Sequence, residues 1–254
     1  MILALIDGDI VAHRCAASIE PTKIKPEREE ASLAIRRADE LLYRIITTLE
    51  TDKYRVYLSG SENFRYHLYP DYKANRRNLP RPQELDSVRG FLAGEWNAQV
   101  CSGYEADDGI GIAAKEGFVI CSIDKDFKQI AGTHYNFVTE SIEEVDDGQA
   151  AYNFWAHMLI GDSSDNVRGV DGIGPVKARR ALQGLSSKEM EATVMDLYGD
   201  RERFFLNRML LRILRSEDDY VRICETIERQ SKGQEVTTTS EGPDSILLSG
   251  VNPK

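Results

Sequence analysis

The sequence predicts an α/β fold with a mostly parallel central sheet flanked by helices. Short apolar runs of strand length alternate with helix-like segments from residue 2 to about residue 150. The strongest runs are continuously apolar, which is typical of parallel strands buried on both faces. Acidic residues follow several of these runs, where functional side chains of an open parallel sheet gather. Strands that alternate with helices favour this class over an all-helical or all-β fold.

The first half of the chain supplies the sheet. Residues 2–6 predict a buried strand, and residues 31–50 place their apolar side chains on one face of a helix. Residues 55–58 predict a second strand, followed by a turn at 59–61. The remaining elements expected in this half are a helix at 83–95, a strand at 98–101, a helix at 106–115, and strands at 118–123 and 135–139.

The strand signal fades after about residue 150. Helices are expected at 151–160, 187–198 and 201–230, and a glycine-rich turn at 169–175 leads into a basic helix. The chain therefore divides into an α/β part over 1–150, a helical part over 151–230 and a polar tail over 231–254. The tail is expected to be loosely held, with a short apolar strand at 246–248.

Composition excludes several classes of protein. The chain has 254 residues, of which 41% are hydrophobic and 29% charged, as in ordinary globular proteins. No apolar run approaches the roughly 18 residues that span a bilayer, and the N-terminal residues lack the pattern of a signal peptide. The four cysteines are scattered without a CxxC pair, which argues against a zinc ribbon or a disulfide framework. We therefore expect a reducing, cytoplasmic compartment.

Carboxylates gather at the ends of the predicted elements. Carboxylates that converge in this way repel one another unless cations lie between them. The absence of histidine and cysteine from these motifs favours Mg²⁺ or Mn²⁺ over Zn²⁺. Taken singly, each cluster has a simpler interpretation as a helix cap, a turn or an acidic first turn. The candidate ligands are Asp7, Glu105, Asp107, Asp108, Asp124, Asp126, Asp162 and Asp165.

The net charge of −10 argues against a nucleic-acid partner, but the basic residues are unevenly distributed. Residues 64–84 mix aromatics and prolines with bases and contain little apolar material for a core. Such a segment suits contact with single-stranded nucleic acid, and a solvated surface loop is the alternative. The candidate contacts in it are Tyr72, Lys73, Arg76 and Arg77.

The turn at 169–175 has a second basic cluster behind it. Glycines let a backbone approach phosphate, and a helix N-terminus offers free N–H groups. The alternative is a helix–turn–helix packing element, and the missing Gly-Lys-Ser/Thr ending argues against a P-loop. The candidate DNA contacts here are Gly172, Gly174, Lys177, Arg179 and Arg180.

Five motifs in order resemble the 5′-nuclease (flap endonuclease-like) superfamily, which includes phage 5′→3′ exonucleases and the 5′-nuclease domain of bacterial DNA polymerase I. They are LIDGD, YPDYKANRR, YEADD, SIDKDF and GDSSDNVRGVDGIGP, and they run from about residue 3 to 215 with their flanking sequence. The chain length is similar to that of the phage-type enzymes.

The resemblance implies a sheet with a helical arch at about 64–84 and a helix–three-turn–helix module. It implies that the eight acids bind Mg²⁺, with Mn²⁺ as a substitute, and that Asp7, Asp107 and Asp124 are catalytic. Lys73 and Arg76 would contact the scissile phosphate or the 5′ strand, with Tyr72 beside them. The 169–175 turn would grip duplex backbone and bind K⁺.

The activity implied is that of a Mg²⁺-dependent 5′→3′ exonuclease and flap endonuclease, acting as a monomer on DNA with a 5′ end or flap. If phage-encoded, it would act in the host cytoplasm. A PIN-like ribonuclease and a catalytically impaired DNA-binding scaffold are the alternatives. The sequence departs from the family pattern at one place, because residues 57–65 lack the usual Asp after the second strand. Glu62 is a candidate replacement, and Asp9 is an extra acid beside Asp7.

Overall fold

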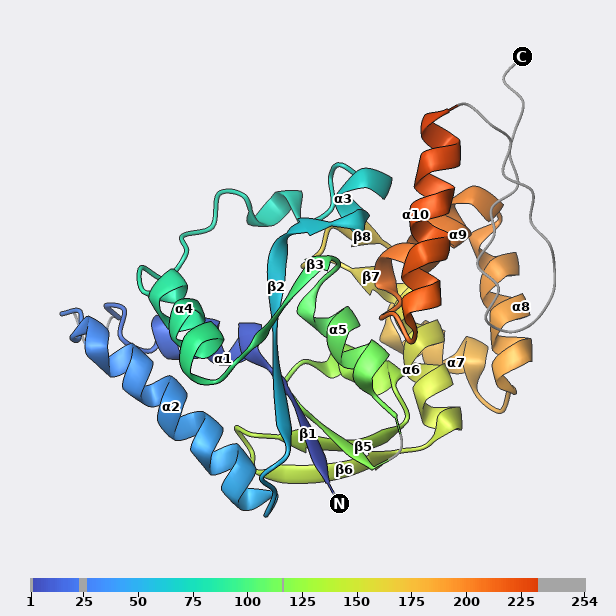
Figure 1. The fold of residues 1–254 in the computed structure, drawn as a ribbon. Coiled ribbons are helices and arrows are strands. Elements are labelled where there is room, and N and C mark those ends of the chain that lie inside the picture. The colour runs from blue at the N-terminus through green and yellow to red at the C-terminus, as the bar shows by residue number, and fades with distance from the viewer. Residues whose placement is uncertain (1, 23–26, 116, 233–254) are drawn as a thin grey trace. The chain divides into compact units, whose positions relative to one another are not determined.

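The computed structural model describes residues 2–22, 27–115 and 117–232. Within them the chain forms two compact units. We call residues 2–62, 79–127 and 132–145 the sheet unit, and residues 63–78, 128–131 and 146–232 the helical unit. Figure 1 labels the elements of both. Residues 64–78, most of the expected arch, thus group with the C-terminal helices.

A six-stranded sheet forms the centre of the sheet unit, in the order β3-β2-β1-β4-β5-β6. β1 pairs in parallel with β2 and β4, and β4 pairs in parallel with β5. The edge strand β6 runs antiparallel to its neighbour β5. The predicted fold class is confirmed. The strands are β1 Leu3–Asp7, β2 Tyr54–Asn63, β3 Gln99–Gly103, β4 Phe118–Cys121, β5 Gly132–Asn136 and β6 Ser141–Val145.

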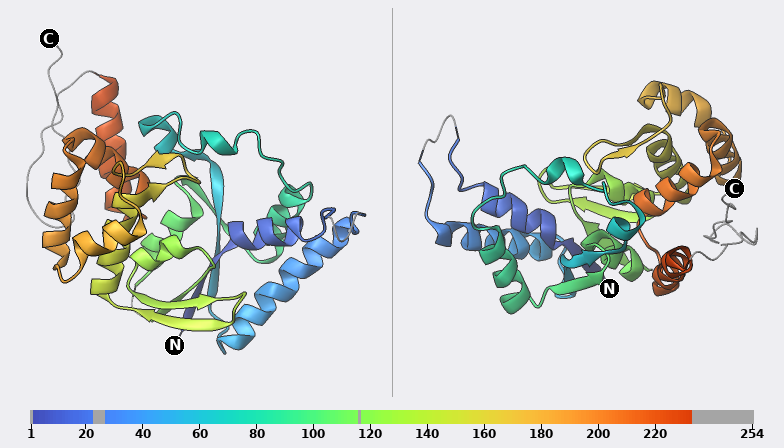
Figure 2. Two further views of the ribbon diagram at one scale, coloured as in Figure 1. Left: turned by 180° about the vertical axis from the view of Figure 1, so that it is seen from behind. Right: turned by 90° about the horizontal axis from the view of Figure 1, so that it is seen from above.

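Helices cover both faces of this sheet (Figures 1 and 2). Helices α1 (Gly8–Ala17), α2 (Ala31–Thr48) and α4 (Leu85–Glu95) pack together on one face. Alternate strand residues such as Ala4 and Ile6 belong to that core. Helix α5 (Ala106–Ala113) packs against β1, and Gly109 lies so close to the Tyr57 ring that a Cβ would clash. Burial on both faces explains the continuous apolar runs.

Four features of the sheet unit differ from the expectation. Helix α1 was not predicted, because its buried face consists mainly of small residues with little apolar contrast. Strand β2 continues to Asn63 where a turn was expected at 59–61. Strand β5 begins three residues before the predicted 135–139 strand. Strand β6, which pairs with β5, was not predicted, because it is exposed at four of five positions and contains no apolar run.

The helical unit is built from short helices and a two-stranded ribbon. The ribbon pairs β7 (Gly161–Asp162) with β8 (Val167–Arg168), and Gly161 and Gly169 pass each other too closely for any Cβ. Its other elements are α3 Phe64–Leu68, η1 Ala74–Arg76, α6 Asp147–Ile160, α7 Pro175–Leu182, α8 Ser187–Tyr198, α9 Arg201–Leu211 and α10 Glu217–Ser231. A capping box between Ser186 and Glu189 begins α8.

Two expectations for this unit are corrected. The helix predicted over 201–230 is two helices, because the chain leaves helical geometry after Leu211 and Ser216 caps a new helix. Residues 64–84 were expected to be poor core material, yet Phe64, Arg65 and Tyr72 are all buried. Tyr72 belongs to the core of the helical unit, which also contains Phe154 and Phe204. The predicted strand at 246–248 and nearly all of the predicted tail lie outside the described residues. No helix among the described residues is long and apolar enough to cross a membrane.

Candidate functional site

Asp7 and Asp124 are joined by one serine in the sheet unit. Asp7 ends β1 and caps α1, where its Oδ1 accepts a hydrogen bond from the Ile10 amide at 3.0 Å. Its Oδ2 accepts a hydrogen bond from the Ser122 hydroxyl at 2.7 Å. The Asp124 amide in turn donates to Ser122 Oγ at 3.0 Å. Ser122 therefore holds together the carboxyl ends of two neighbouring parallel strands, β1 and β4.

Asp7 is buried among other carboxylates. It is 1% exposed. Burial raises its pKa to about 7, against the lowering effect of the Ile10 and Ser122 hydrogen bonds, and the charges of Asp9 and Asp124 raise it further. A buried carboxylate with like charges beside it is stabilised by a cation. The candidate metal-ligand atoms here are carboxylate oxygens, so the site fits a hard divalent ion better than zinc.

Three further candidate ligands lie in the first turn of α5. Glu105 caps this helix, and the Glu105 and Asp108 side chains form a reciprocal capping box. Asp108 is fully buried, and its Oδ2 accepts a hydrogen bond from the Glu105 amide at 3.1 Å. Asp108 thus lies in an acidic first turn, which was the simpler interpretation of this motif, and also takes part in the capping box. Asp107 is partly exposed on the same turn.

Asp126 continues the turn that Asp124 begins. Its amide donates to Asp124 Oδ1 at 2.9 Å, and the two residues lie at the start of η2 (Lys125–Gln129). Glu62, the candidate replacement for the missing Asp, is exposed near the end of β2.

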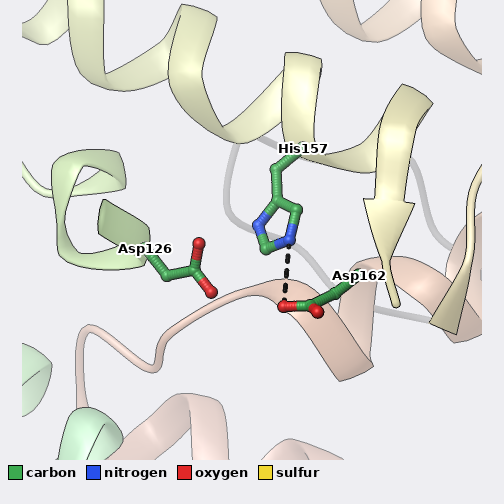
Figure 3. A group of neighbouring side chains, drawn as sticks. All are labelled: Asp126, His157 and Asp162. Carbon is green, nitrogen blue, oxygen red and sulfur yellow. Dashed lines mark ion pairs between the residues drawn. The ribbon is translucent and has the colours of Figure 1, made fainter. Parts of the chain in front are cut away.

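Asp162 organises the loop between β7 and β8 in the helical unit. Its Oδ1 accepts hydrogen bonds from the amide and hydroxyl of Ser164, each at 2.7 Å. His157 Nε2, from α6, lies 3.6 Å from Oδ2 (Figure 3). The contact with His157, followed by the hydrogen bonds from Ser164, holds the pKa of Asp162 well below its usual range. This carboxylate is ionised at neutral pH.

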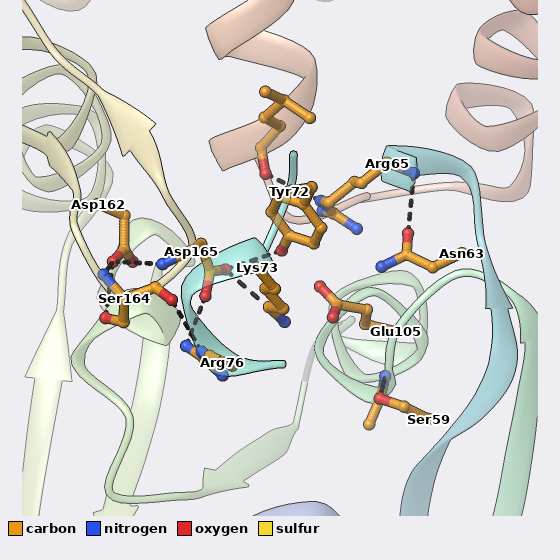
Figure 4. A network of polar contacts seen from close by, with 12 residues as sticks. Ser59, Asn63, Arg65, Tyr72, Lys73, Arg76, Glu105, Asp162, Ser164 and Asp165 are labelled. Atoms are coloured by element: carbon orange, nitrogen blue, oxygen red, sulfur yellow. Dashed lines mark hydrogen bonds and ion pairs between the residues drawn. The ribbon is translucent and has the colours of Figure 1, made fainter. Parts of the chain in front are cut away.

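Asp165 receives three side chains from the basic segment (Figure 4). The Tyr72 hydroxyl donates to Oδ2 at 2.8 Å, and Arg76 Nη2 lies 2.5 Å from Oδ1. Lys73 Nζ lies 3.7 Å from Oδ2. These contacts bring the sequence-predicted residues Tyr72, Lys73, Arg76 and Asp165 together within one unit.

Main-chain contacts fix the same segment to the β7–β8 loop. The Lys73 amide donates to the Asp165 carbonyl at 2.9 Å, and Arg76 Nε donates to the Ser164 carbonyl at 2.8 Å. Lys73 adopts the left-handed backbone conformation with φ of 55°, which is uncommon outside glycine and asparagine. Arg77, by contrast, is exposed and donates to the Pro70 carbonyl.

The burial of Tyr72 corrects one expectation. Its ring is 1% exposed and packs inside the helical unit, so it is not available to stack on a base in this structure. Lys73 is partly exposed and Arg76 is exposed, so both can meet a phosphate while they neutralise Asp165. The segment thus exposes the cations of Lys73 and Arg76, while the buried Tyr72 ring anchors it.

The glycine-rich turn leads into α7 as expected. Gly172 has φ of +75°, and Gly174 caps the helix ahead of Pro175. Lys177 Nζ donates to the Gly172 carbonyl at 2.7 Å, which closes the turn. Arg179 and Arg180 are exposed on the same helix. Lys177 lies in the first turn of α7, near the N-terminus that suits phosphate, whereas Arg179 and Arg180 lie in the last turn.

Sequence reasoning missed the residues that support these groups. Ser122 links Asp7 to Asp124, and Arg65 donates from a buried position to the carbonyls of Leu210 and Arg212. Asn207 donates to the Arg168 carbonyl at 2.7 Å, beside the start of the glycine-rich turn. These contacts join residues that are distant in sequence, and no local spacing reveals them.

The family model for the 5′-3′ exonuclease, N-terminal resolvase-like domain matches residues 2–154. DNA polymerase I of Deinococcus radiodurans is 27% identical over 204 residues, which cover 74% of this chain and 21% of that polymerase. The chain therefore spans about a fifth of the polymerase it matches. Flap endonuclease Xni of Shewanella baltica is 26% identical over 201 residues, which cover 72% of this chain and 74% of that protein.

Solved structures show the same fold. The D15 protein of bacteriophage T5, co-crystallised with metal ions, superposes with a TM-score of 0.64 at 16% identity, over 92% of this chain and 98% of that one. Flap endonuclease-1 of Methanococcus jannaschii gives a TM-score of 0.53 at 15% identity, over 85% and 79% of the two chains. The resemblance inferred from the motifs is confirmed: this chain belongs to the 5′-3′ exonuclease family through its N-terminal resolvase-like domain.

Proposed function

We propose that this protein is a Mg²⁺-dependent 5′→3′ exonuclease and flap endonuclease that hydrolyses phosphodiester bonds of DNA. The observation that carries the proposal is the buried Asp7 carboxylate, joined through Ser122 to Asp124 at the ends of two parallel strands. Relatives named for flap endonuclease activity and a T5 neighbour solved with DNA and metal ions support the same activity.

The sheet unit would hold divalent ions through Asp7, Asp107 and Asp124, and Glu105 and Asp126 lie on the same turns. Bound divalent ions supply an activated water and stabilise negative charge on a phosphate undergoing displacement. The chain's own contribution is to orient these carboxylates. Ser122 does so for Asp7 by donating a hydrogen bond to its carboxylate. Asp162 and Asp165 are the candidate ligands of the helical unit.

Two basic regions would bind the DNA. Lys73 and Arg76 lie on a segment anchored by Tyr72, and a fixed cation stabilises charge that develops on a phosphate. The glycine-rich turn and α7 would contact duplex backbone through Lys177, Arg179 and Arg180. A K⁺ ion at this turn is also part of the proposal, and to bind the Gly172 carbonyl it would have to displace the Lys177 ammonium.

The proposal extends to where and in what form the protein acts. No disulfide joins the four cysteines, all of which lie in the described part of the chain, and three of them are buried, which suits a reducing cytoplasm. We propose that the protein acts there as a monomer.

Cleavage of a labelled 5′-flap DNA tests the proposed function. We expect Mg²⁺ to support cleavage that leaves a 5′-phosphate, and EDTA to abolish it. Asp107→Asn is the inactive control: it removes a partly exposed carboxylate without touching the capping box, so flap binding should remain. A single-stranded RNA of the same sequence tests the ribonuclease alternative. Faster cleavage of that RNA than of the flap, or unchanged turnover in Asp107→Asn, would contradict the proposal.

A further inference from the structure

Asp9 has a place in the sheet unit that the candidate metal ligands do not explain. It lies in the first turn of α1, two residues after Asp7. Its Oδ2 accepts a hydrogen bond from the Ser59 amide at 2.9 Å, and its Oδ1 is paired with Arg89 of α4. Both side chains of the pair are about three-quarters buried, with 29% and 25% exposed. A charged pair buried to this extent is held in a fixed geometry.

Ser59, whose amide donates to Asp9, lies in the stretch where the family pattern has an Asp. Ser59 belongs to the stretch 57–65, which follows the predicted second strand and lacks the usual Asp. The backbone of Ser59 receives the Asp9 carboxylate on its N–H and the Arg89 guanidinium on its carbonyl. The chain thus lacks the usual Asp in this stretch and carries an extra acid, Asp9, on α1 that contacts the stretch.

The network continues to the helix that carries other candidate ligands. Ser59 Oγ accepts a hydrogen bond from the Ala106 amide at 2.9 Å. Ala106 is the first residue of α5, and Glu105 and Asp107 flank it. A single set of contacts therefore links the first turn of α1, strand β2, helix α4 and the start of α5.

We propose that Asp9, held by Arg89, is a positioning residue that replaces the Asp missing from residues 57–65. It fixes Ser59 and, through Ser59, the start of α5, and so sets how the carboxylates of α5 stand relative to Asp7. The proposal rests on the proposed function, because it assumes that these carboxylates bind divalent ions. Both oxygens of Asp9 are occupied by protein donors, which favours a role through its neighbours over direct metal binding.

Mn²⁺ titration of the DNA-free protein, followed by calorimetry, tests this role. Asp9→Asn and Arg89→Met should each weaken Mn²⁺ binding by about tenfold, as loss of a group behind a metal ligand commonly does. The same variants should lower kcat on flap DNA with little change in KM. Arg89→Lys keeps the charge but loses the two-pronged guanidinium, so it should recover only part of the affinity.

Arg81→Met is the matched control. Arg81 pairs with Asp86 at the start of α4, and both side chains are exposed, at 67% and 81%. This variant removes an arginine from the same region and should leave Mn²⁺ affinity and melting temperature unchanged.

Three results would overturn the inference. Asp9→Asn and Arg89→Met that melt at lower temperature but keep wild-type Mn²⁺ affinity would show that the network only stabilises the fold. A binding stoichiometry lower by one ion in Asp9→Asn would make Asp9 a direct ligand. A wild-type protein that binds Mn²⁺ but cleaves no DNA would refute the proposed function and leave the affinity test of Asp9 standing, whereas one that binds no Mn²⁺ would refute both.

Discussion

The hydroxyl of Tyr72 donates a hydrogen bond to Oδ2 of Asp165 at 2.8 Å, from a ring that is 1% exposed. The basic segment is therefore joined to the β7–β8 loop at its most buried point. Hydrogen bonds to a charged group contribute more to stability than those between neutral groups. The same contact holds in place the carboxylate that Lys73 and Arg76 approach.

Tyr72→Phe should lower the free energy of unfolding by about 1.5–3 kcal/mol, because it leaves the buried side of the Asp165 carboxylate without its donor. Urea unfolding of the metal-free protein measures this. Tyr66→Phe is the control, since Tyr66 touches the Tyr72 ring but is 44% exposed. Equal unfolding free energies in the two variants would show that the Tyr72 hydrogen bond contributes nothing.

Asp7 makes the stability of the metal-free protein depend on pH. Its folded pKa of about 7 lies above the ordinary value of 3.8, so the stability it contributes is fully present below pH 3.8 and is lost as the pH rises through 7. In EDTA, the wild-type protein should lose stability between pH 5 and pH 8, by at most about 3 kcal/mol, because about two pH units of the shift lie above pH 5 at about 1.4 kcal/mol each. Asp7→Asn should lack this loss.

Urea unfolding at the two pH values provides the comparison. Asp124→Asn is a useful second variant, because it removes one of the charges that raise the Asp7 pKa and should reduce the loss without abolishing it. A wild-type protein more stable at pH 8 than at pH 5 by an amount that disappears in Asp7→Asn would reverse the assigned direction of the shift.

The sequence predicts the sheet and the positions of the acids well, because both depend on local patterns. Apolar runs identify β1 and β4, and the acids directly after them lie at the sheet's carboxyl edge for that reason alone. The burial of Tyr72 was not predictable in the same way. A segment of mixed aromatics, prolines and bases has no period, and its core partners lie about 80 to 140 residues further along the chain.

The support of the site is likewise invisible to local reasoning. Ser122 meets Asp7 across 115 positions, and Arg89 meets Asp9 across 80. Strand β6 was missed for a related reason. Four of its five residues are exposed, so no apolar run marks it, and only its pairing with β5 defines it as a strand. Tertiary contacts decide both cases.

Arg76 and Arg77 are neighbours with different surroundings, and they test the role of the basic segment. Arg76 contacts Asp165 and the Ser164 carbonyl, whereas Arg77 donates only to the nearby Pro70 carbonyl among the hydrogen bonds described. Arg76→Met should lower the single-turnover rate on flap DNA by roughly 10²–10³, as loss of an oriented donor to developing charge does. Its effect on Kd should be much smaller.

Rapid-quench kinetics at saturating enzyme, together with Kd from anisotropy in Ca²⁺, separate the two effects. Arg77→Met is the control and should change Kd modestly with a near-normal rate. An Arg76→Met protein that binds poorly yet cleaves at the wild-type rate once saturated would make this segment a docking surface only.

The exposed bases of α7 should bind DNA without regard to sequence. Arg179 and Arg180 lie on the solvent side of a helix whose N-terminus carries the glycine-rich turn, and Lys177 is bonded to that turn. Each phosphate contact releases counterions, so Arg179→Ala should reduce the slope of log K against log salt by about one. Lys177→Ala should do the same and also loosen the turn, so it should weaken binding more than Arg179→Ala.

Lys188→Ala is the control, because Lys188 is an exposed lysine on the next helix. The measurement is the affinity for three unrelated duplex sequences between 50 and 200 mM KCl. Over this range, a protein that makes about six or more phosphate contacts loses at least about 10³ in affinity. A loss confined to one sequence, or a slope unchanged in both α7 variants, would mean that this surface does not grip the DNA backbone.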